Sequence, residues 1–284
     1  MKKFLALMLA LVMVFALAAC GEAETEETTP ATEPAGEETP AGEETAPAGE
    51  TGEFTTVEEG KLIMATNAAF PPYEMTDDSG AVIGIDADLA AAIAEKLGLE
   101  LVIDDMDFDG ALLAVQQGKA DMMLAGLSVT PDREAVMDFS DSYATGVQVV
   151  IVTEDSDIAT AGDLEGKLIG CQRGTTGYLY ASDTPENGGY GEDAVVAYDN
   201  GITAVQALQN GQVDAVIIDN GPAQEFVAAN AGLKILETPW VEEEYAIGLT
   251  KGNDALNAAI NDALAELIAD GTVQSIIDTY ISAE

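Results

Sequence analysis

The chain has 284 residues, with 52 acidic and 10 basic side chains, no histidine and two cysteines. The net charge of −42 excludes nucleic acid as a partner, because phosphate binding requires a positively charged surface. Without histidine the chain cannot build a Ser-His-Asp or Cys-His catalytic site or a histidine-bearing zinc site, and two cysteines give no disulfide framework.

Residues 1–19 have the features of a secretory signal, because Lys2 and Lys3 precede an apolar stretch that ends in small residues. The sequence Leu-Ala-Ala before Cys20 resembles the lipobox of bacterial lipoproteins. We therefore expect cleavage before Cys20 and its acylation, which supplies the two acyl chains that stable membrane attachment needs. The alternative is an ordinary signal peptide with an incidental cysteine, but the position of Cys20 directly after the apolar run favours lipidation.

Residues 20–56 consist almost entirely of Glu, Thr, Pro, Ala and Gly. They include eleven glutamates and neither lysine nor arginine. Such a segment cannot bury enough apolar surface to offset its chain entropy, and its charges repel one another. We interpret it as a disordered tether that holds a folded domain away from the membrane.

The remaining residues, 57–284, contain 41 acidic and eight basic side chains and alternate between β-type and helical patterns. In the first part we predict strands at 61–66, 100–104, 121–125 and 146–153, and helices at 86–97 and 111–117. The pattern then restarts, with strands at 167–171, 194–198, 215–218 and 233–236, and helices at 177–182, 202–209 and 222–229. A strand at 245–250 and a helix at 254–269 follow, with Gly271 ending the helix.

This alternation predicts an α/β fold in which helices cover parallel sheets. The long strands near residues 148 and 246 are interpreted as crossings between two lobes. We therefore predict a discontinuous first lobe, 57–147 plus 247–284, and an inserted second lobe, 148–246. Because ligands of open α/β sheets bind beyond the carboxyl ends of the strands, the cleft between the lobes is the expected binding site.

Two loops at strand ends carry groups suited to an anion. One contains Ser128 and Arg133 before a short helix, and an arginine can hold a carboxylate through two parallel hydrogen bonds. The other contains Gln172, Thr175 and Thr176 in a turn with two glycines. Arg133 could equally be a surface cation that pairs with acidic residues, but two such loops at one cleft favour binding.

Asp219 follows the strand at 215–218 and precedes a helix, so its position alone predicts a helix N-cap. If the first loop holds an α-carboxylate, however, a carboxylate on the opposite lobe is what an α-ammonium group requires. The rings of Phe70, Tyr73 and Phe108 are expected in the core or, as loop residues at a cleft, against a ligand side chain.

Five ordered motifs make residues 57–284 resemble the substrate-binding proteins of polar amino-acid ABC transporters, which have the periplasmic-binding-protein type II fold. The motifs are TNAAFPPYE, GIDADLAAAIAEKLG, MDFDGALLAVQQGKADMMLAGLSVTPDREAVMDFSDSY, CQRGTTG and VDAVIIDNGPA. By this resemblance Arg133 clamps the ligand α-carboxylate and Asp219 meets the α-ammonium group. The remaining implied ligand contacts are Ala125, Gly126, Ser128, Thr175 and Thr176 around the carboxylate, Phe70 and Phe108 beside the side chain, and Asn67, Asp109 and Gln172 near its end.

The chain departs from some relatives at the side-chain end of the site. Asn67 stands where several histidine- or glutamine-binding relatives carry aspartate, and Gln172 where some carry lysine. Asp109 and the acidic surroundings favour arginine or lysine, whereas Arg173 opposes a basic ligand. Asn67 and Gln172 equally suit glutamine, cystine or histidine.

We therefore expect a receptor that closes around one free amino acid and delivers it to the permease and ATPase subunits of an ABC importer. It is expected to be monomeric, to use neither cofactor nor metal, and to be lipid-anchored on the outer face of the cytoplasmic membrane of a Gram-positive-type bacterium. The main alternative is an enzyme on the same fold, such as a dehydratase or lyase acting on a small carboxylate. A sensor domain is a third interpretation.

Overall fold

The computed structural model describes residues 54–237 and 239–281. Within them, one sheet has the strand order β5-β1-β6-β12-β7-β10-β8-β9, and β11 pairs with β7. The strands are β1 (Lys61–Thr66), β5 (Glu100–Asp105), β6 (Met122–Met123), β7 (Met137–Thr153), β8 (Ile169–Gln172), β9 (Val195–Tyr198), β10 (Ala215–Asp219), β11 (Leu233–Ile235) and β12 (Val241–Thr250). Cys20 and the predicted signal and tether up to residue 53 lie outside the described residues.

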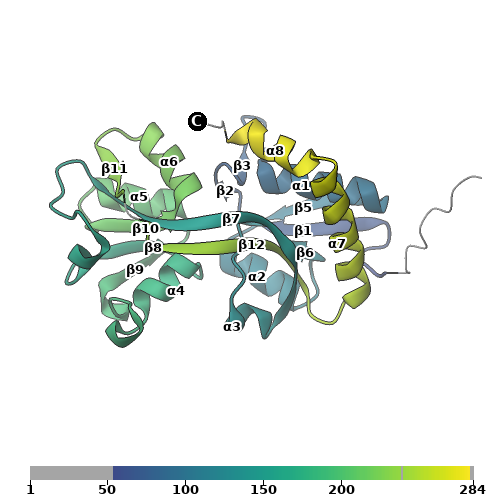
Figure 1. The fold of residues 1–284 in the computed structure, drawn as a ribbon, viewed down its shortest axis with the longest axis horizontal. Helices are drawn as coiled ribbons and strands as arrows, with labels where there is room; N and C mark the ends of the chain where they lie inside the picture. The colour runs from purple at the N-terminus through teal and green to yellow at the C-terminus, as the bar shows by residue number, and fades with distance from the viewer. Residues whose placement is uncertain (1–53, 238, 282–284) are drawn as a thin grey trace, which may run out of the picture. The chain divides into compact units, whose positions relative to one another are not determined.

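The sheet contains two parallel groups joined by two antiparallel strands. β1 pairs in parallel with β5 and β6, and β8 pairs in parallel with β9 and β10. Between the groups, β7 and β12 run antiparallel to each other, and Figure 1 shows them passing between two sets of helices. The predicted α/β fold is confirmed, and the lobe boundaries within these two strands stay a prediction.

Helices pack beside both parallel groups. In Figure 1 the helices α1, α2, α7 and α8 accompany β1, β5 and β6, whereas α4, α5 and α6 accompany β8, β9 and β10. Their bounds are α1 Ile85–Leu97, α2 Phe108–Gln116, α4 Thr176–Ser182, α5 Gly201–Gln209, α6 Asn220–Ala229, α7 Asp254–Ala269 and α8 Thr272–Tyr280. None of the helices among the described residues has the length and apolarity needed to cross a membrane.

The apolar face of α7 contributes to the core. In α7 the side chains of Leu256, Ile260, Leu264 and Leu267 are all buried, as the 3.6-residue period requires. Complete burial of each such side chain contributes about 1.5–3 kcal/mol relative to exposure. This packing fixes α7 against the sheet that presents the first loop of the site.

The short helix expected at the loop of Arg133 is α3 (Pro131–Glu134). Several other elements were not predicted. They are the small hairpin sheet of β2 (Ala69–Phe70), β3 (Glu74–Thr76) and β4 (Val82–Ile83), the first half of β7, and α8. Gly271 does follow α7 in the left-handed conformation, but it also begins α8. The start of β7 is polar, and it becomes a strand because β12 pairs with it from Met137 onwards.

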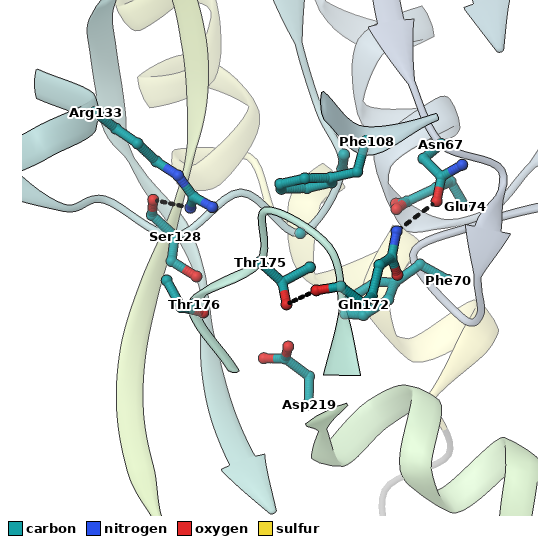
Figure 2. Close-up of a pocket in the computed structure, with 12 residues that line it drawn as sticks. Asn67, Phe70, Glu74, Phe108, Ser128, Arg133, Gln172, Thr175, Thr176 and Asp219 are labelled. Carbon is teal, nitrogen blue, oxygen red and sulfur yellow. Dashed lines mark hydrogen bonds between the residues drawn. The ribbon is translucent and has the colours of Figure 1, made fainter. Parts of the chain in front are cut away.

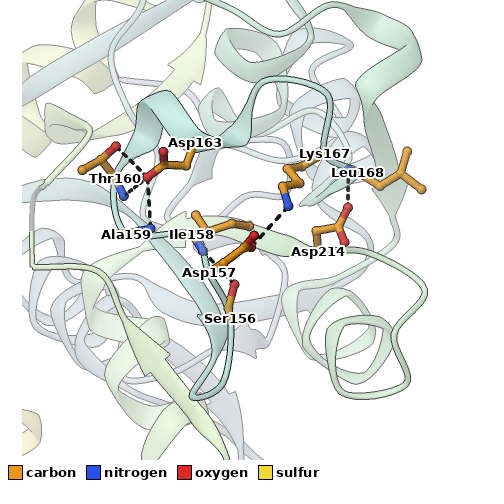
Figure 3. Close-up of polar contacts among 9 residues, drawn as sticks. All are labelled: Ser156, Asp157, Ile158, Ala159, Thr160, Asp163, Lys167, Leu168 and Asp214. Atoms are coloured by element: carbon orange, nitrogen blue, oxygen red, sulfur yellow. Dashed lines mark hydrogen bonds and ion pairs between the residues drawn. The ribbon is translucent and has the colours of Figure 1, made fainter.

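The acidic loop after β7 shows that many carboxylates of this chain have local structural roles. Asp163 accepts hydrogen bonds from the amides of Ala159 and Thr160 at 3.1 and 2.9 Å, which caps a single 3₁₀ turn at Ala161–Leu164. Figure 3 also shows the ion pair of Lys167 with Asp157, whose N and O atoms lie 3.3 Å apart. These acidic side chains are accounted for by loop geometry alone.

Candidate ligand-binding site

A single pocket brings together eleven of the twelve residues predicted to bind ligand. It is formed by residues that follow or end β1, β6, β8 and β10, by the β2–β3 hairpin and by the start of α2. Figure 2 shows the labelled side chains around this space. Its lining consists of Asn67, Phe70, Glu74, Phe108, Ala125, Gly126, Ser128, Arg133, Gln172, Thr175, Thr176 and Asp219. The lining contains one residue that the sequence did not single out, Glu74.

Asp109 is the predicted site residue that lies outside this pocket. It lines a neighbouring cavity of about 370 Å³ together with Asp107, Phe108, Arg173 and Asp199. A Cβ atom built on Gly174 would overlap Oδ1 of Asp109, so this carboxyl group lies directly against the backbone of the turn after β8. Asp109 therefore borders the site from the side, at a contact between the two predicted lobes.

Arg133 is buried, and its orientation is set by α3. Thr130 caps this helix by accepting a hydrogen bond from the Arg133 amide at 3.3 Å. The guanidinium donates to the carbonyl oxygens of Ser128 at 2.8 Å and Gly174 at 3.1 Å, and its Cζ lies 5.5 Å from the centre of the Phe108 ring.

Among the described residues every ion pair involves a lysine, so Arg133 has no carboxylate partner within 4.0 Å. Burial lowers the pKa of this guanidinium, and nearby carboxylates offset part of the effect. A buried cation with only neutral acceptors is suited to binding an anion.

Asp219 takes the N-cap position of α6, but its side chain makes no cap hydrogen bond. Its two oxygens instead accept from the hydroxyl of Tyr245 and from Nε2 of Gln148, the latter at 2.7 Å. Burial, the largest effect, raises the pKa of Asp219 to about 7, and the charge of Glu243 also raises it. The cap interpretation of Asp219 is therefore wrong as regards its side chain, which faces the pocket.

A hydrogen bond joins two predicted site residues, Asn67 and Gln172, at the end of the pocket where they lie. Nε2 of Gln172 donates to Oδ1 of Asn67 at 2.9 Å, and Nδ2 of Asn67 donates to the carbonyl of Met106 at 2.8 Å. The space left among the lining side chains is about 20 Å³, room for about one water molecule. A space of this size cannot hold an amino acid, so the pocket must widen before one binds.

Glu74 lies at the same end and is fully buried. Neither of its carboxyl oxygens receives a hydrogen bond from an N–H or hydroxyl donor among the described residues. Burial, the charge of Asp86 and a side-chain hydrogen bond with Asp86 all raise its pKa well above the usual range. Glu74 belongs to the motif TNAAFPPYE. The Glu74 side chain points into the pocket because Glu74 pairs with Phe70 in the hairpin of β2 and β3, and this hairpin was not predicted.

Asp86 supports the first loop from behind. Its oxygens accept hydrogen bonds from the Gly126 amide and the Tyr143 hydroxyl, both at 2.8 Å. Gly126 has a φ of +52°, and a Cβ at this position would come within 2.7 Å of the Phe70 ring. Only glycine allows the loop to approach Phe70 this closely.

Comparisons with known proteins agree with this geometry. A sequence model of the bacterial extracellular solute-binding proteins, family 3, matches residues 62–283. The chain belongs to this family. The predicted function, a solute-binding protein that serves an amino-acid ABC importer, is thereby confirmed as a class, and an extracytoplasmic location follows from it.

Relatives of this solute-binding protein are named for several amino acids. It is 30% identical to the arginine-binding extracellular protein ArtP of Bacillus subtilis, with 100% of both chains covered. It is 29% identical to the L-cystine-binding protein TcyJ of Escherichia coli, with 80% of this chain and 85% of TcyJ covered. The arginine-, lysine-, histidine-binding protein ArtJ of Geobacillus stearothermophilus has a similar structure, with 32% identity, a TM-score of 0.74, and 79% and 96% coverage.

Replacing Gly174 with alanine is expected to weaken ligand binding by this solute-binding protein at least tenfold, because the methyl group would collide with Asp109. Gly166 is a matched control, since its φ of +76° nearly equals the +75° of Gly174 and no atom lies within 4 Å of its built Cβ. Both variants should lose about 1 kcal/mol of stability from backbone strain. Titration calorimetry should show reduced affinity for Gly174→Ala only, and equal affinities would contradict the prediction.

The ligand-free protein is expected to lose stability as pH rises from about 4 to about 7. Burial raises the pKa of Asp86 to about 6 and that of Asp219 to about 7, both from a reference value of 3.8. The folded state therefore holds protons more tightly than the unfolded state. The stability from this effect is fully present below about pH 4, where both states are protonated, and it is lost as pH rises through the folded-state pKa values. Calorimetric unfolding should show a smaller pH dependence for Asp219→Asn, and an unchanged dependence would exclude Asp219 as a source.

Proposed function

We propose that this protein captures one free L-α-amino acid with a cationic side chain, such as arginine or lysine. The proposal rests on the charges around the pocket. An amino-acid zwitterion would balance Arg133 with its carboxylate and Asp219 with its ammonium group. The buried carboxyl group of Glu74, once it loses its proton, would then be matched by a further positive charge on the ligand.

Glu74 is the observation that carries this choice of ligand. Both of its oxygens lack an N–H or hydroxyl donor among the described residues. The carboxyl group of Asp86 can share a hydrogen bond with Glu74 only while one of the two groups is protonated, so an ionised Glu74 needs another partner. A guanidinium or ammonium group has several N–H donors and could satisfy both oxygens at once. The neutral pair Asn67 and Gln172 at the same end would accommodate the remaining polar atoms, as it would in the alternatives glutamine, cystine and histidine.

The proposed mechanism is closure of the two predicted lobes around the ligand. Arg133 and Asp219 come from different predicted lobes, so a ligand that contacts both favours the closed form over the open form. The closed form is then presented to the permease and ATPase subunits of the importer. We assign no catalytic step to the site, and we propose a monomer.

The predicted lipid anchor belongs to the same proposal. Acylation of Cys20 would hold the receptor on the outer face of the cytoplasmic membrane, and the tether at 20–56 would keep it at high local concentration near its permease. Replacing Cys20 with alanine should release the protein from membranes, and unchanged membrane partitioning would contradict the anchor.

The experiment that tests the ligand is a thermal-shift screen of the protein against the twenty amino acids, followed by calorimetry of those that stabilise it. A specific ligand raises the unfolding midpoint by mass action. Arginine or lysine should give the largest shift. A larger shift with glutamine or cystine would reject the cationic ligand, but the protein would still be an amino-acid receptor. Recovery of a chemically converted compound would favour the enzyme alternative.

A further inference from the structure

Glu243 is a buried carboxylate in β12 that neither lines the pocket nor was singled out in the sequence. Its side chain is 8% exposed, whereas those of Glu242 and Glu244 are exposed, because successive residues of a strand point to opposite faces. It shares its face with Tyr245, which binds Asp219. Glu243 is therefore placed directly behind the pocket wall.

One oxygen of Glu243 accepts three hydrogen bonds, two from pocket-lining residues and one from Gln148. Its Oε2 accepts from the hydroxyls of Ser128 at 3.0 Å and Thr176 at 2.9 Å, and from Nε2 of Gln148 at 3.0 Å. The same Nε2 donates to Asp219 at 2.7 Å. Ser128 and Thr176 belong to different predicted lobes, so one carboxylate orients a hydroxyl group from each side of the pocket.

This arrangement determines whether the two hydroxyl groups can donate or accept hydrogen bonds with a ligand. A hydroxyl group has a single proton, and once this proton is donated to Glu243 the oxygen can act only as an acceptor. The wall formed by Ser128, Thr176 and Asp219 then presents acceptors, whereas Arg133 presents donors. The Arg133 guanidinium and these side-chain oxygens therefore have opposite hydrogen-bonding polarity, although they are adjacent at Ser128. The hydroxyl groups of Ser128 and Thr176 are then not available as donors for the carboxylate contacts that the family resemblance implied for these residues.

We propose that Glu243 is a positioning residue that makes the pocket select ligands with an α-ammonium group. An ammonium group brings three donors to this acceptor wall, while a ligand without one leaves buried acceptors unpaired. Glu243 achieves this through the hydroxyl groups it orients, without touching the ligand. This inference rests on the proposed function, because it assumes an amino acid whose carboxylate lies at Arg133.

The test compares L-arginine with 5-guanidinopentanoate, which is the same molecule without the α-amino group. By calorimetry the wild-type protein should prefer L-arginine by about 1000-fold or more. Glu243→Gln should reduce this preference at least tenfold, because the new amide can donate to the hydroxyl oxygens and reverse their polarity. Glu242→Gln, which makes the same charge change on an exposed neighbour, should leave the preference unchanged.

A second variant keeps the inference testable if the Glu243→Gln protein fails to fold. If Glu243 acts through the hydroxyl groups, Ser128→Ala combined with Thr176→Val should reduce the preference by a similar factor, and adding Glu243→Gln should reduce it little further. An unchanged preference in either the Glu243 variant or the double variant would overturn the inference. Failure of the wild-type protein to bind any amino acid would instead reject the proposed function. If the protein prefers an amino acid other than L-arginine, the same comparison is made between that amino acid and its analogue without the α-amino group.

Discussion

Arg133→Ala is expected to reduce amino-acid affinity by about 30- to several thousand-fold, the largest effect of any single substitution in this pocket. Removing one partner of a buried charge pair costs about 2–5 kcal/mol, since the other partner loses its hydrogen bonds as well. Here the partner is the ligand carboxylate, because Arg133 has only carbonyl acceptors within the described protein. Titration calorimetry with the best ligand of the screen measures the loss directly.

Two further variants make the Arg133 result specific. Arg133→Lys keeps the charge but loses the parallel pair of donors, so its affinity should fall between the wild-type and alanine values. Lys119→Ala removes an exposed positive charge and should bind normally. Circular dichroism should show a folded Arg133→Ala protein, and affinity within tenfold of wild type would remove Arg133 from the binding site.

Glu74→Gln is expected to lower the affinity for arginine about 100-fold, while affecting glutamine much less. The amide keeps the shape of the carboxyl group but removes the negative charge that the ligand cation needs in a fully buried position. Because burial raises the pKa of Glu74, binding of a cation should also release a proton, and the variant should lose this release. Calorimetry in two buffers of different ionisation enthalpy measures both effects.

The control for Glu74 is Glu95→Gln, which makes the same chemical change on the exposed side of α1. It should bind like the wild-type protein. The ligand-free Glu74→Gln protein should unfold at the same temperature or higher, because a buried carboxyl group without donors is removed. Equal losses of affinity for arginine and glutamine would show that Glu74 shapes the pocket but does not recognise the charge of the ligand side chain.

The sequence predicted the pocket well where loops follow long, apolar elements. Asp219 ends the buried strand β10, and the loop and short helix that carry Arg133 follow the buried strand β6. The carboxyl ends of parallel strands meet at one edge of a sheet, so the proximity of these two residues follows from topology. The faces of α1 and α7 follow from helical period. The short hairpin that carries Glu74 has too few residues for any period to be recognised.

The direction in which each site side chain points, and the residues it bonds to, could be seen only in the tertiary structure. Position alone favoured a cap role for Asp219, but Tyr245 and Gln148 come from two other strands and bind its oxygens instead. Glu243 is in phase with the buried Tyr245, yet three consecutive glutamates are normally a solvated stretch, and only the pairing of β12 with β7 turns the middle one inward.

The sequence by itself determined the acidic composition, the α/β alternation, the family resemblance and the residue types that could bind an amino acid, because these depend on local order along the chain. The tertiary structure decided which carboxyl groups are buried, which hydroxyl groups they orient, and that Asp109 borders the pocket rather than lining it. These properties depend on contacts between residues about 50 to more than 100 positions apart, such as Ser128 with Glu243, and no local pattern encodes them.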